Sequence, residues 1–151
     1  ILLLSKALGG GMPLGAFISS RKMMKTLAEN PALGHITTFG GHPVCCAAGF
    51  AALNVLLKNN LISGVEAKGR LFEKLLTHPK IKSIHRVGLM IALQFENFKQ
   101  NKKVIDRCIE KGVLTDWFLF APNCMRIAPP LIISDAEIEK ACNIILESLT
   151  E

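Results

Sequence analysis

The sequence predicts an α/β or α+β fold, in which helices pack in layers against a sheet. Short apolar segments with strand character alternate along the chain with longer segments whose apolar residues recur at helical spacing. Half of the 151 residues are hydrophobic and one-fifth are charged, a composition typical of a folded chain and not of a disordered one. A chain of this length can bury one sizeable core, and no apolar run in it is long enough to cross a bilayer.

The first 60 residues are expected to form two short strands and two helices. Residues 1–4 are all apolar and predict a buried strand, and residues 15–20 predict a second strand. Residues 21–29 predict a helix, which ends at the Asn-Pro pair that follows. Residues 43–58 begin with proline, are rich in Ala and Leu, and carry almost no charge. They predict a helix that is buried on most sides.

The composition changes near residue 60, where we predict a boundary between a first domain, residues 1–60, and a second domain, residues 61–151. Charged and apolar residues alternate at helical spacing in residues 61–77, which predict a helix with one apolar stripe. The members of this stripe are Leu61, Val65, Phe72, Leu75 and Leu76.

The middle of the second domain is expected to contain strands and one helix. Residues 81–95 alternate as a strand does, and Gly88 within them predicts a bulge or a close contact. Residues 102–111 predict a helix whose inward side chains are Val104, Ile105, Cys108 and Ile109. Gly112 is a natural stop for this helix, and a short strand is expected at residues 113–114.

The last helix has the clearest start signal in the chain. Ser134 and Glu137 have the spacing of a capping box, in which each side chain bonds to the backbone N–H of the other residue. Apolar residues then follow at the spacing of one helix face. They are Ile138, Ala141, Cys142, Ile145, Leu146 and Leu149.

Charge, cysteines and histidines exclude several classes of function. The net charge of +6 is spread along the chain without a long basic run, which favours a solvated surface over nucleic-acid binding. The five cysteines are odd in number and none has metal-type spacing, so we expect buried free thiols in a reducing cytoplasm. The four histidines are scattered, and we expect no metal site.

Lys6 is the candidate catalytic residue. It follows the apolar run and precedes a glycine-rich turn. A lysine at the end of a buried strand loses part of its hydration, which disfavours the ammonium form and lowers the pKa. A neutral amine is a nucleophile that condenses with aldehydes, so Lys6 could carry an aldehyde cofactor. The alternative is a solvated lysine at the end of a strand.

Two further segments carry chemistry. Thr37 and Thr38 lie in a loop with two glycines ahead of a helix start, and their hydroxyls together with free N–H groups form a plausible phosphate cradle. The alternative for this loop is a glycine turn with a threonine cap. Arg126 lies in an apolar segment just before two prolines, and its planar fork can hold a carboxylate. The alternative for Arg126 is a structural ion pair.

The three segments together describe pyridoxal phosphate (PLP) chemistry on an amino acid. Lys6 to Pro13 resembles the Lys-Ala-Leu-x-Gly-Gly-x-x-Pro motif around the cofactor lysine of the class III aminotransferases, of the ornithine and acetylornithine type. Thr37 to Pro43 is similar to the family's Ser/Thr-Thr-aromatic-Gly-Gly-x-Pro loop, and Arg126 to Leu131 to its Arg-x-x-Pro-Pro-Leu segment. The motifs occur in family order, and the resemblance covers essentially the whole chain.

The resemblance implies a PLP-dependent enzyme of fold type I, with residues 1–60 ending the large α/β domain and 61–151 forming a small C-terminal α/β domain. It implies that Lys6 bonds to PLP and acts as the general base, and that Thr37 and Thr38 bind the cofactor phosphate. It implies that Arg126 grips a carboxylate of the 2-oxoglutarate/glutamate pair, and that the enzyme is a cytoplasmic homodimer with a shared active site.

The resemblance also implies that other parts of the site lie before residue 1. These are the carboxylate for the pyridine nitrogen, the ring-stacking aromatic residue and a second phosphate loop. We therefore expect the chain to be the C-terminal part of a longer polypeptide and nearly inactive alone. Two alternatives stay open, another PLP enzyme of the same fold, such as an aminomutase or a decarboxylase, and a non-catalytic dimerising module.

Overall fold

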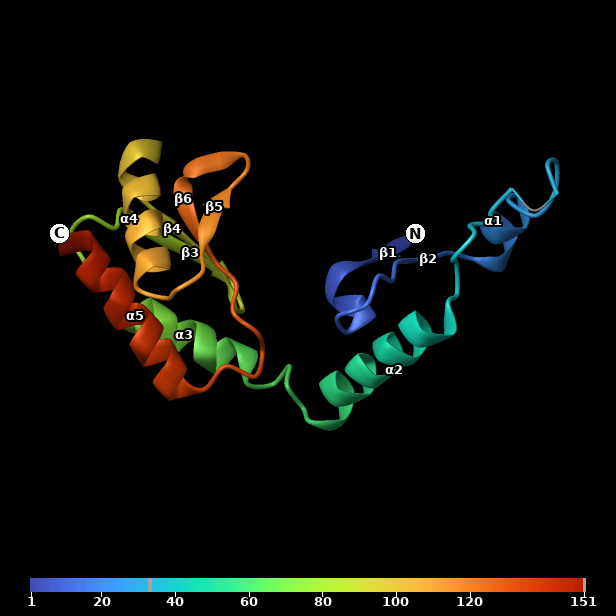
Figure 1. Ribbon diagram of the computed structural model, residues 1–151, viewed down its shortest axis with the longest axis horizontal. Coiled ribbons are helices and arrows are strands. Elements are labelled where there is room, and N and C mark those ends of the chain that lie inside the picture. The colour runs from blue at the N-terminus through green and yellow to red at the C-terminus, as the bar shows by residue number, and fades with distance from the viewer. Residues whose placement is uncertain (33, 151) are drawn as a thin grey trace. The chain divides into compact units, whose positions relative to one another are not determined.

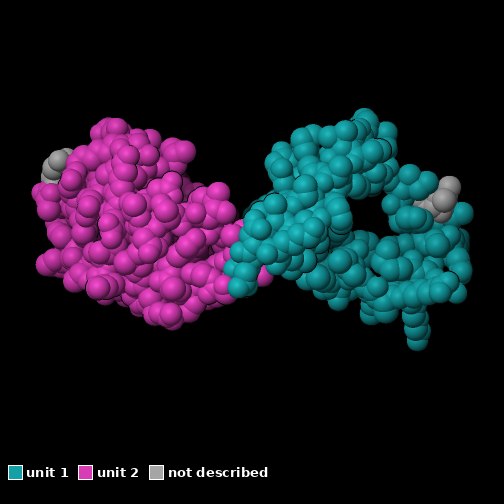
Figure 2. Space-filling model, turned by 90° about the horizontal axis from the view of Figure 1, so that it is seen from below, with its two compact units in different colours: residues 1–60 teal, residues 61–151 magenta. Residues whose placement is uncertain are grey.

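The computed structural model describes residues 1–32 and 34–150. The chain forms two compact units, Ile1–Asn60 and Leu61–Glu151, which Figure 2 shows in different colours. No helix of the described residues is long and apolar enough to cross a membrane.

The first unit consists of a small hairpin-like sheet and helices. Strand β1 (Leu2–Leu4) pairs antiparallel with β2 (Ala16–Ile18), with Leu3 opposite Phe17. The 3-10 helix η1 (Lys6–Gly9) lies between the two strands along the chain, and helices α1 (Arg21–Lys25) and α2 (Pro43–Lys58) follow (Figure 1). The predicted strands and the bounds of α2 are confirmed. Helix α1 ends four residues earlier than predicted, where the N–H of Thr26 bonds to the Met23 carbonyl.

The burial predicted for the first unit is wrong. Leu3 in β1 is 74% exposed, and within α2 only Gly49 is buried, with Phe50 70% exposed. The apolar pattern predicted the secondary structure correctly. It predicted burial wrongly because a two-stranded sheet has no second layer of its own to cover it.

The second unit is an antiparallel sheet covered on one face by helices (Figure 1). The sheet order is β3-β4-β6-β5, and the strands are β3 (Ser83–Val87), β4 (Met90–Gln94), β5 (Asp116–Phe118) and β6 (Ala121–Ile127). The helices are α3 (Val65–Leu75), α4 (Phe98–Glu110) and α5 (Asp135–Thr150).

One hydrophobic core lies between this sheet and its helices. Alternate residues of β4 and β6 point into it, among them Ile91, Leu93 and Met125, which have no exposed surface. Phe72 of α3, Ile105 of α4 and Ile138 of α5 meet them from the helical side, as predicted for these three residues. The remaining residues of the same strands, including Ala92 and Arg126, therefore lie on the sheet face that the helices leave uncovered.

The segment around Gly88 is a hairpin and not one bulged strand, but the close contact predicted as the alternative is confirmed, because a Cβ on Gly88 would come within 2.6 Å of Val65 Cγ1. Val87 pairs with Met90, which leaves Gly88 and Leu89 as a two-residue turn, and Gly88 has a φ of 57°. Glycine at the first turn position is typical of type II′ hairpins, because it adopts positive φ without a steric cost. Gly88 therefore marked a turn. The turn was not predicted because the residues on both sides of it alternate with period two and together resemble one long strand.

Three boundaries in the second unit also differ from the prediction. Helix α3 begins at Val65, four residues later than predicted, and ends at Leu75, two residues earlier. Helix α4 begins at Phe98, four residues early, because the Asn97 side chain accepts a bond from the N–H of Gln100 at 2.9 Å. Ile109 of this helix is 45% exposed and not inward as predicted. Residues 113–114 are not a strand; β5 starts at Asp116. The stop at Gly112, with a φ of 90°, is confirmed.

The capping box at the last helix is confirmed. The N–H of Ser134 donates to Glu137 Oε2 at 2.8 Å, and the N–H of Glu137 donates to Ser134 Oγ at 3.3 Å. The hydrogen bond from the Ser134 backbone holds the pKa of the Glu137 carboxyl below its ordinary value. Helix α5 therefore starts where the sequence predicts it.

The cysteine prediction holds for three of the five residues. Cys108, Cys124 and Cys142 are buried free thiols, and burial raises the pKa of Cys142 to about 12. Cys45 is half-buried and Cys46 is exposed, because α2 is exposed along most of its length. Among the described residues, no group of three or more His, Cys, Asp or Glu side chains is placed to hold a metal ion.

Gly69→Ala is expected to destabilise the second unit by about 1–3 kcal/mol. A Cβ at Gly69 would collide with the carbonyl oxygen of Gly88 and come within 3.0 Å of Arg86 Nη1, so α3 would have to move away from the β3–β4 turn. Urea unfolding followed by Trp117 fluorescence measures this loss. Gly64→Ala is the matched control, since a Cβ there meets nothing within 4 Å, and equal stability of the two variants would contradict the close packing.

Candidate functional site

Lys6 stands at the first position of η1, immediately after β1 and Ser5. Its φ is 55°, a left-handed conformation that costs a non-glycine residue about 1 kcal/mol. Residues held in such conformations cluster at functional sites, because the surrounding structure must impose them. The side chain is exposed, so the first unit by itself does not supply the desolvation predicted for this amine. Lys6 is not buried as predicted because, as at β1, the two-stranded sheet has no second layer that covers it.

The turn that carries Lys6 is docked on α2 through glycines. A Cβ on Gly10, which has a φ of 58°, would come within 2.6 Å of the Ala48 carbonyl oxygen. A Cβ on Gly49 would come within 2.8 Å of the Leu8 carbonyl oxygen. These two glycines therefore bring the backbone of η1 against the backbone of α2. The contact fixes the position of Lys6 relative to the helix that follows the threonine loop.

Thr37 and Thr38 line a cavity of about 370 Å³ at the start of α2. The N–H of Gly40 bonds to the Thr37 carbonyl at 3.3 Å, which folds the loop into a turn, and Gly41 continues it with a φ of 72°. A Cβ on Gly41 would meet nothing within 4 Å. The cavity is also lined by Pro13, Leu14, Gly15, Phe39, Gly40, Gly41 and Cys45, and Lys6 does not line it.

Hydroxyl groups and the first N–H groups of a helix are the donors that a phosphate accepts best, and this loop provides both beside an open cavity. The residues present therefore fit the phosphate end of a cofactor. Lys6 fits the aldehyde end, since its amine has no hydrogen-bond partner among the described residues.

Arg126 lies on β6, on the uncovered face of the second unit's sheet, and is paired with Asp116 of β5. Its Nε donates to Asp116 Oδ1 at 2.7 Å, and its Nη2 donates to Oδ2. The two side chains are 44% and 47% exposed. The structure thus contains the structural ion pair that was the alternative for Arg126. The pair occupies one edge of the guanidinium and leaves Nη1 without a partner among the described residues.

Asp116 was not recognised from the sequence. Its partner Arg126 is ten residues away along the chain, and β5 pairs with β6 in a register that sets the two residues directly opposite. A prediction of the β5–β6 hairpin would have found the pair. The apolar tip of this hairpin, Leu119 and Phe120, lacks the usual turn residues and concealed it.

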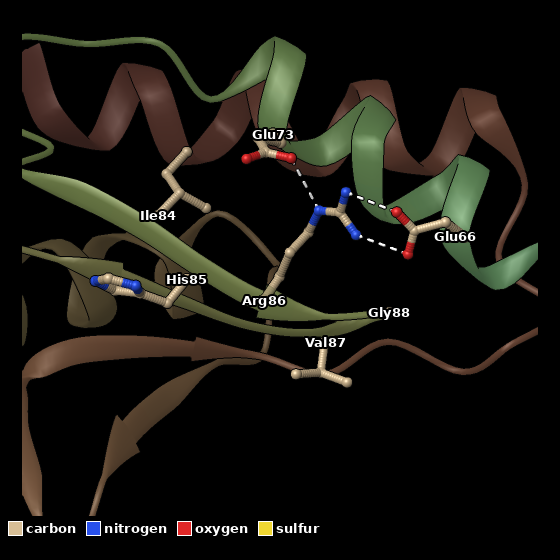
Figure 3. Close-up of a pocket in the computed structure, with 7 residues that line it drawn as sticks. All are labelled: Glu66, Glu73, Ile84, His85, Arg86, Val87 and Gly88. Carbon is tan, nitrogen blue, oxygen red and sulfur yellow. Dashed lines mark hydrogen bonds and ion pairs between the residues drawn. The ribbon is translucent and has the colours of Figure 1, made fainter.

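A second cluster of charges in this unit is structural. Arg86 donates from Nε to Glu73 at 2.9 Å and from both Nη atoms to Glu66 at 3.0 Å, which joins β3 to α3 (Figure 3). Its side chain is 14% exposed. The hydrogen bonds from Arg86 lower the pKa of the Glu66 carboxyl, and these bonds raise the pKa of Arg86. The three side chains bond to each other, so this cluster serves to hold β3 against α3.

Comparison with known proteins decides the family. The family model described as Aminotransferase class-III matches residues 1–149. The chain belongs to the class III aminotransferases. It is 38% identical to an acetylornithine aminotransferase of Haemophilus ducreyi and 34% identical to one of Caldanaerobacter subterraneus, each over the whole of this chain. It covers 37% and 38% of those relatives, so this class III chain spans a little over one-third of their length.

Solved structures agree with the family assignment. An ornithine aminotransferase from Toxoplasma gondii superposes with a TM-score of 0.85 and 31% sequence identity, over 98% of this chain and 36% of that one. A second structure of that enzyme records partial occupancy of PLP at its active site. The class III chain therefore has the fold of the C-terminal part of a PLP-dependent aminotransferase.

Proposed function

We propose that this chain is the C-terminal part of an aminotransferase that moves an amino group from an amino acid or ω-amine to 2-oxoglutarate. The observation that carries the proposal is the position of Lys6, which has a strained backbone, a free amine and the place of the cofactor lysine in the family's motif order. The names of the relatives support a donor of the acetylornithine type, and the name of the Toxoplasma gondii enzyme supports one of the ornithine type.

Each proposed site residue has one role. PLP, when bound, supplies the electron sink that stabilises negative charge on the substrate carbon. Lys6 would hold the cofactor through its amine and, when that amine is free, would move a proton to and from the substrate carbon as general base. Thr38, with Thr37, donates hydrogen bonds to the phosphate. Arg126 binds a carboxylate of 2-oxoglutarate.

The proposed assembly is a cytoplasmic homodimer with a shared active site. Lys6 lies outside the cavity that Thr37 and Thr38 line. That separation is compatible with a threonine loop that serves the partner's cofactor. In this arrangement residues 1–60 end the large cofactor-binding domain, and residues 61–151 form the small domain. The chain alone is expected to be inactive, because about two-thirds of the relatives' length is outside it.

The experiment uses a protein of the relatives' length that contains this chain, here called the full-length protein. After reconstitution with PLP, its spectrum should show the lysine-bound cofactor at roughly 410–430 nm. Mixing with ornithine or acetylornithine and 2-oxoglutarate should then produce glutamate. A protein that takes up PLP without producing glutamate favours the aminomutase or decarboxylase alternative. A protein that never takes up PLP favours the dimerising module.

Arg126→Lys is expected to raise the KM for 2-oxoglutarate about tenfold while cofactor absorbance stays unchanged. Lysine keeps the positive charge but cannot make two parallel hydrogen bonds, and the loss of one charged bond is worth about 1.5 kcal/mol. Steady-state kinetics of the full-length protein measure the change. An equal loss of PLP binding would instead show that Arg126 only maintains the fold through Asp116.

Thr38→Ala is expected to weaken PLP retention by about tenfold, because one hydrogen bond to a charged phosphate is lost. Equilibrium dialysis of the full-length protein against PLP measures it. Thr38→Ser is the matched control, since it keeps the hydroxyl and should retain PLP as the parent does. Unchanged retention in the alanine variant would remove Thr38 from the phosphate site.

A further inference from the structure

A single row of residues crosses the uncovered face of the sheet in the second unit. His85 on β3 pairs with Ala92 on β4, Ala92 pairs with Arg126 on β6, and Arg126 pairs with Asp116 on β5. Paired residues of neighbouring strands point to the same face of a sheet. His85, Ala92 and Arg126 accordingly line one cavity of about 540 Å³. Figure 3 shows Arg86, the neighbour of His85, pointing instead toward α3.

Asp116 fixes the orientation of the guanidinium at one end of this row. Its carboxylate takes the edge formed by Nε and Nη2, so the planar group presents Nη1 on the side away from Asp116. A guanidinium has five N–H donors, and a carboxylate on one edge leaves the others available to a second carboxylate. Asp116 is thus a positioning residue for Arg126, and the pair remains nearly half exposed.

Ala92 leaves a gap between Arg126 and His85. Neighbouring strands are about 4.8 Å apart, so β3 and β6 flank β4 at a separation of about 10 Å. Only a methyl group rises from β4 between the imidazole and the guanidinium. Nε2 of His85 is bonded to Ser83 Oγ at 3.0 Å, and Nδ1 has no hydrogen-bond partner among the described residues, so Nδ1 donates to a ligand when it carries the ring proton.

Most of the remaining cavity wall is apolar. It comes from the tip of the β5–β6 hairpin, where Phe118, Leu119 and Phe120 precede Ala121, and Cys124 of β6 completes it. Leu119 and Phe120 are 79% and 96% exposed. A ligand that suits this surface carries a carboxylate for the two nitrogen groups and a short aliphatic chain for the hairpin.

We propose that His85 and Ala92 extend the Arg126 site into a notch that determines specificity for a short aliphatic carboxylate, with His85 as the second donor and Ala92 as the space between. This inference rests on the proposed role of Arg126 in binding 2-oxoglutarate. The inference adds His85 and Ala92 to the residues that select the carboxylate. It also explains why the residue between His85 and Arg126 is as small as alanine.

The kinetic test uses one substitution that fills the notch, at Ala92, and one that removes its second donor, at His85. In the full-length protein, Ala92→Leu should raise the KM for 2-oxoglutarate at least about tenfold and His85→Ala about fivefold, changes worth about 1–1.5 kcal/mol. The turnover number and the cofactor absorbance should stay within about twofold, because neither residue belongs to the cofactor site. Val87→Leu is the control; it adds bulk on β3 outside the row, at a residue that is 86% exposed.

Arg126→Lys separates this inference from the proposed function. If Arg126→Lys raises the KM but the two notch variants leave it within twofold of the parent, the notch is wrong and the role of Arg126 stands. If Arg126→Lys also has no effect on the KM, the proposed role of Arg126 fails and the notch fails with it.

A direct binding measurement needs no cofactor. The isotope-labelled 151-residue chain can be titrated with glutarate while the nitrogen signals of the arginine Nε and histidine ring atoms are followed by NMR. The notch predicts that Arg126 and His85 shift together with one binding constant, while Arg86, paired with Glu66 and Glu73, does not shift. A shift of Arg126 alone, or of neither residue, would overturn the notch.

Discussion

Lys6→Ala in the full-length protein is expected to lower the rate of amino transfer at least about a thousandfold, at the upper part of the range for removing a general base. The substitution removes the covalent attachment of the cofactor and the base in one step. The absorbance of the lysine-bound cofactor should disappear together with the activity. Stopped-flow spectra with the amino donor and steady-state glutamate production measure the two effects separately.

Lys22→Ala is the matched control for this variant. Lys22 is an exposed lysine in α1, sixteen positions further along the same unit, and it has no place in the proposed site. The control should keep both the absorbance and the activity. A Lys6→Ala protein that transfers amino groups at the parental rate would remove Lys6 from the chemistry.

Phe72→Ala is expected to cost the second unit about 3–5 kcal/mol of unfolding free energy. Phe72 is 1% exposed and lies in the core between α3 and the sheet, so its removal leaves a cavity that rigid neighbours such as Ile145 of α5 and Ile127 of β6 cannot fill. Urea unfolding of the 151-residue chain, followed by Trp117 fluorescence, measures the loss.

Phe120→Ala provides the comparison, because Phe120 belongs to the same unit and is 96% exposed. Its removal should change the unfolding free energy by less than about 0.5 kcal/mol, as at other surface positions. Two equally destabilised variants would mean that the core lies elsewhere than between the sheet and α3.

Local signals predicted the helices of this fold well. The bounds of α2 follow from Pro43 at the first turn, and the start of α5 follows from the Ser134–Glu137 box; both signals act within a few residues. The β3–β4 hairpin was missed because a two-residue turn interrupts the alternation only briefly. Asn97 caps the start of α4. It was not recognised as a capping residue because the first turn of the helix after it is mostly polar and lacks the apolar spacing of a helix face.

Burial and the site geometry depend on contacts that local patterns do not contain. The apolar residues of β1 and α2 predicted a covering layer, and the first unit by itself does not form that layer, so Lys6 is exposed. The three motifs identified Lys6, Thr37, Thr38 and Arg126 as residue types with suitable chemistry. The pairing of Arg126 with Asp116, and its row with Ala92 and His85, follow from sheet register, which a single sequence specifies only weakly for short strands.

The central claim is a covalent bond between Lys6 and PLP, and reduction with borohydride followed by peptide mass spectrometry tests it most directly. Borohydride reduces the carbon–nitrogen double bond between the lysine and the cofactor to a stable amine, so the modified lysine survives proteolysis. We expect the added mass of the reduced cofactor on the peptide that contains Lys6, and on no peptide of the Lys6→Ala protein. Stoichiometric modification of another lysine, with Lys6 unmodified, would contradict the account.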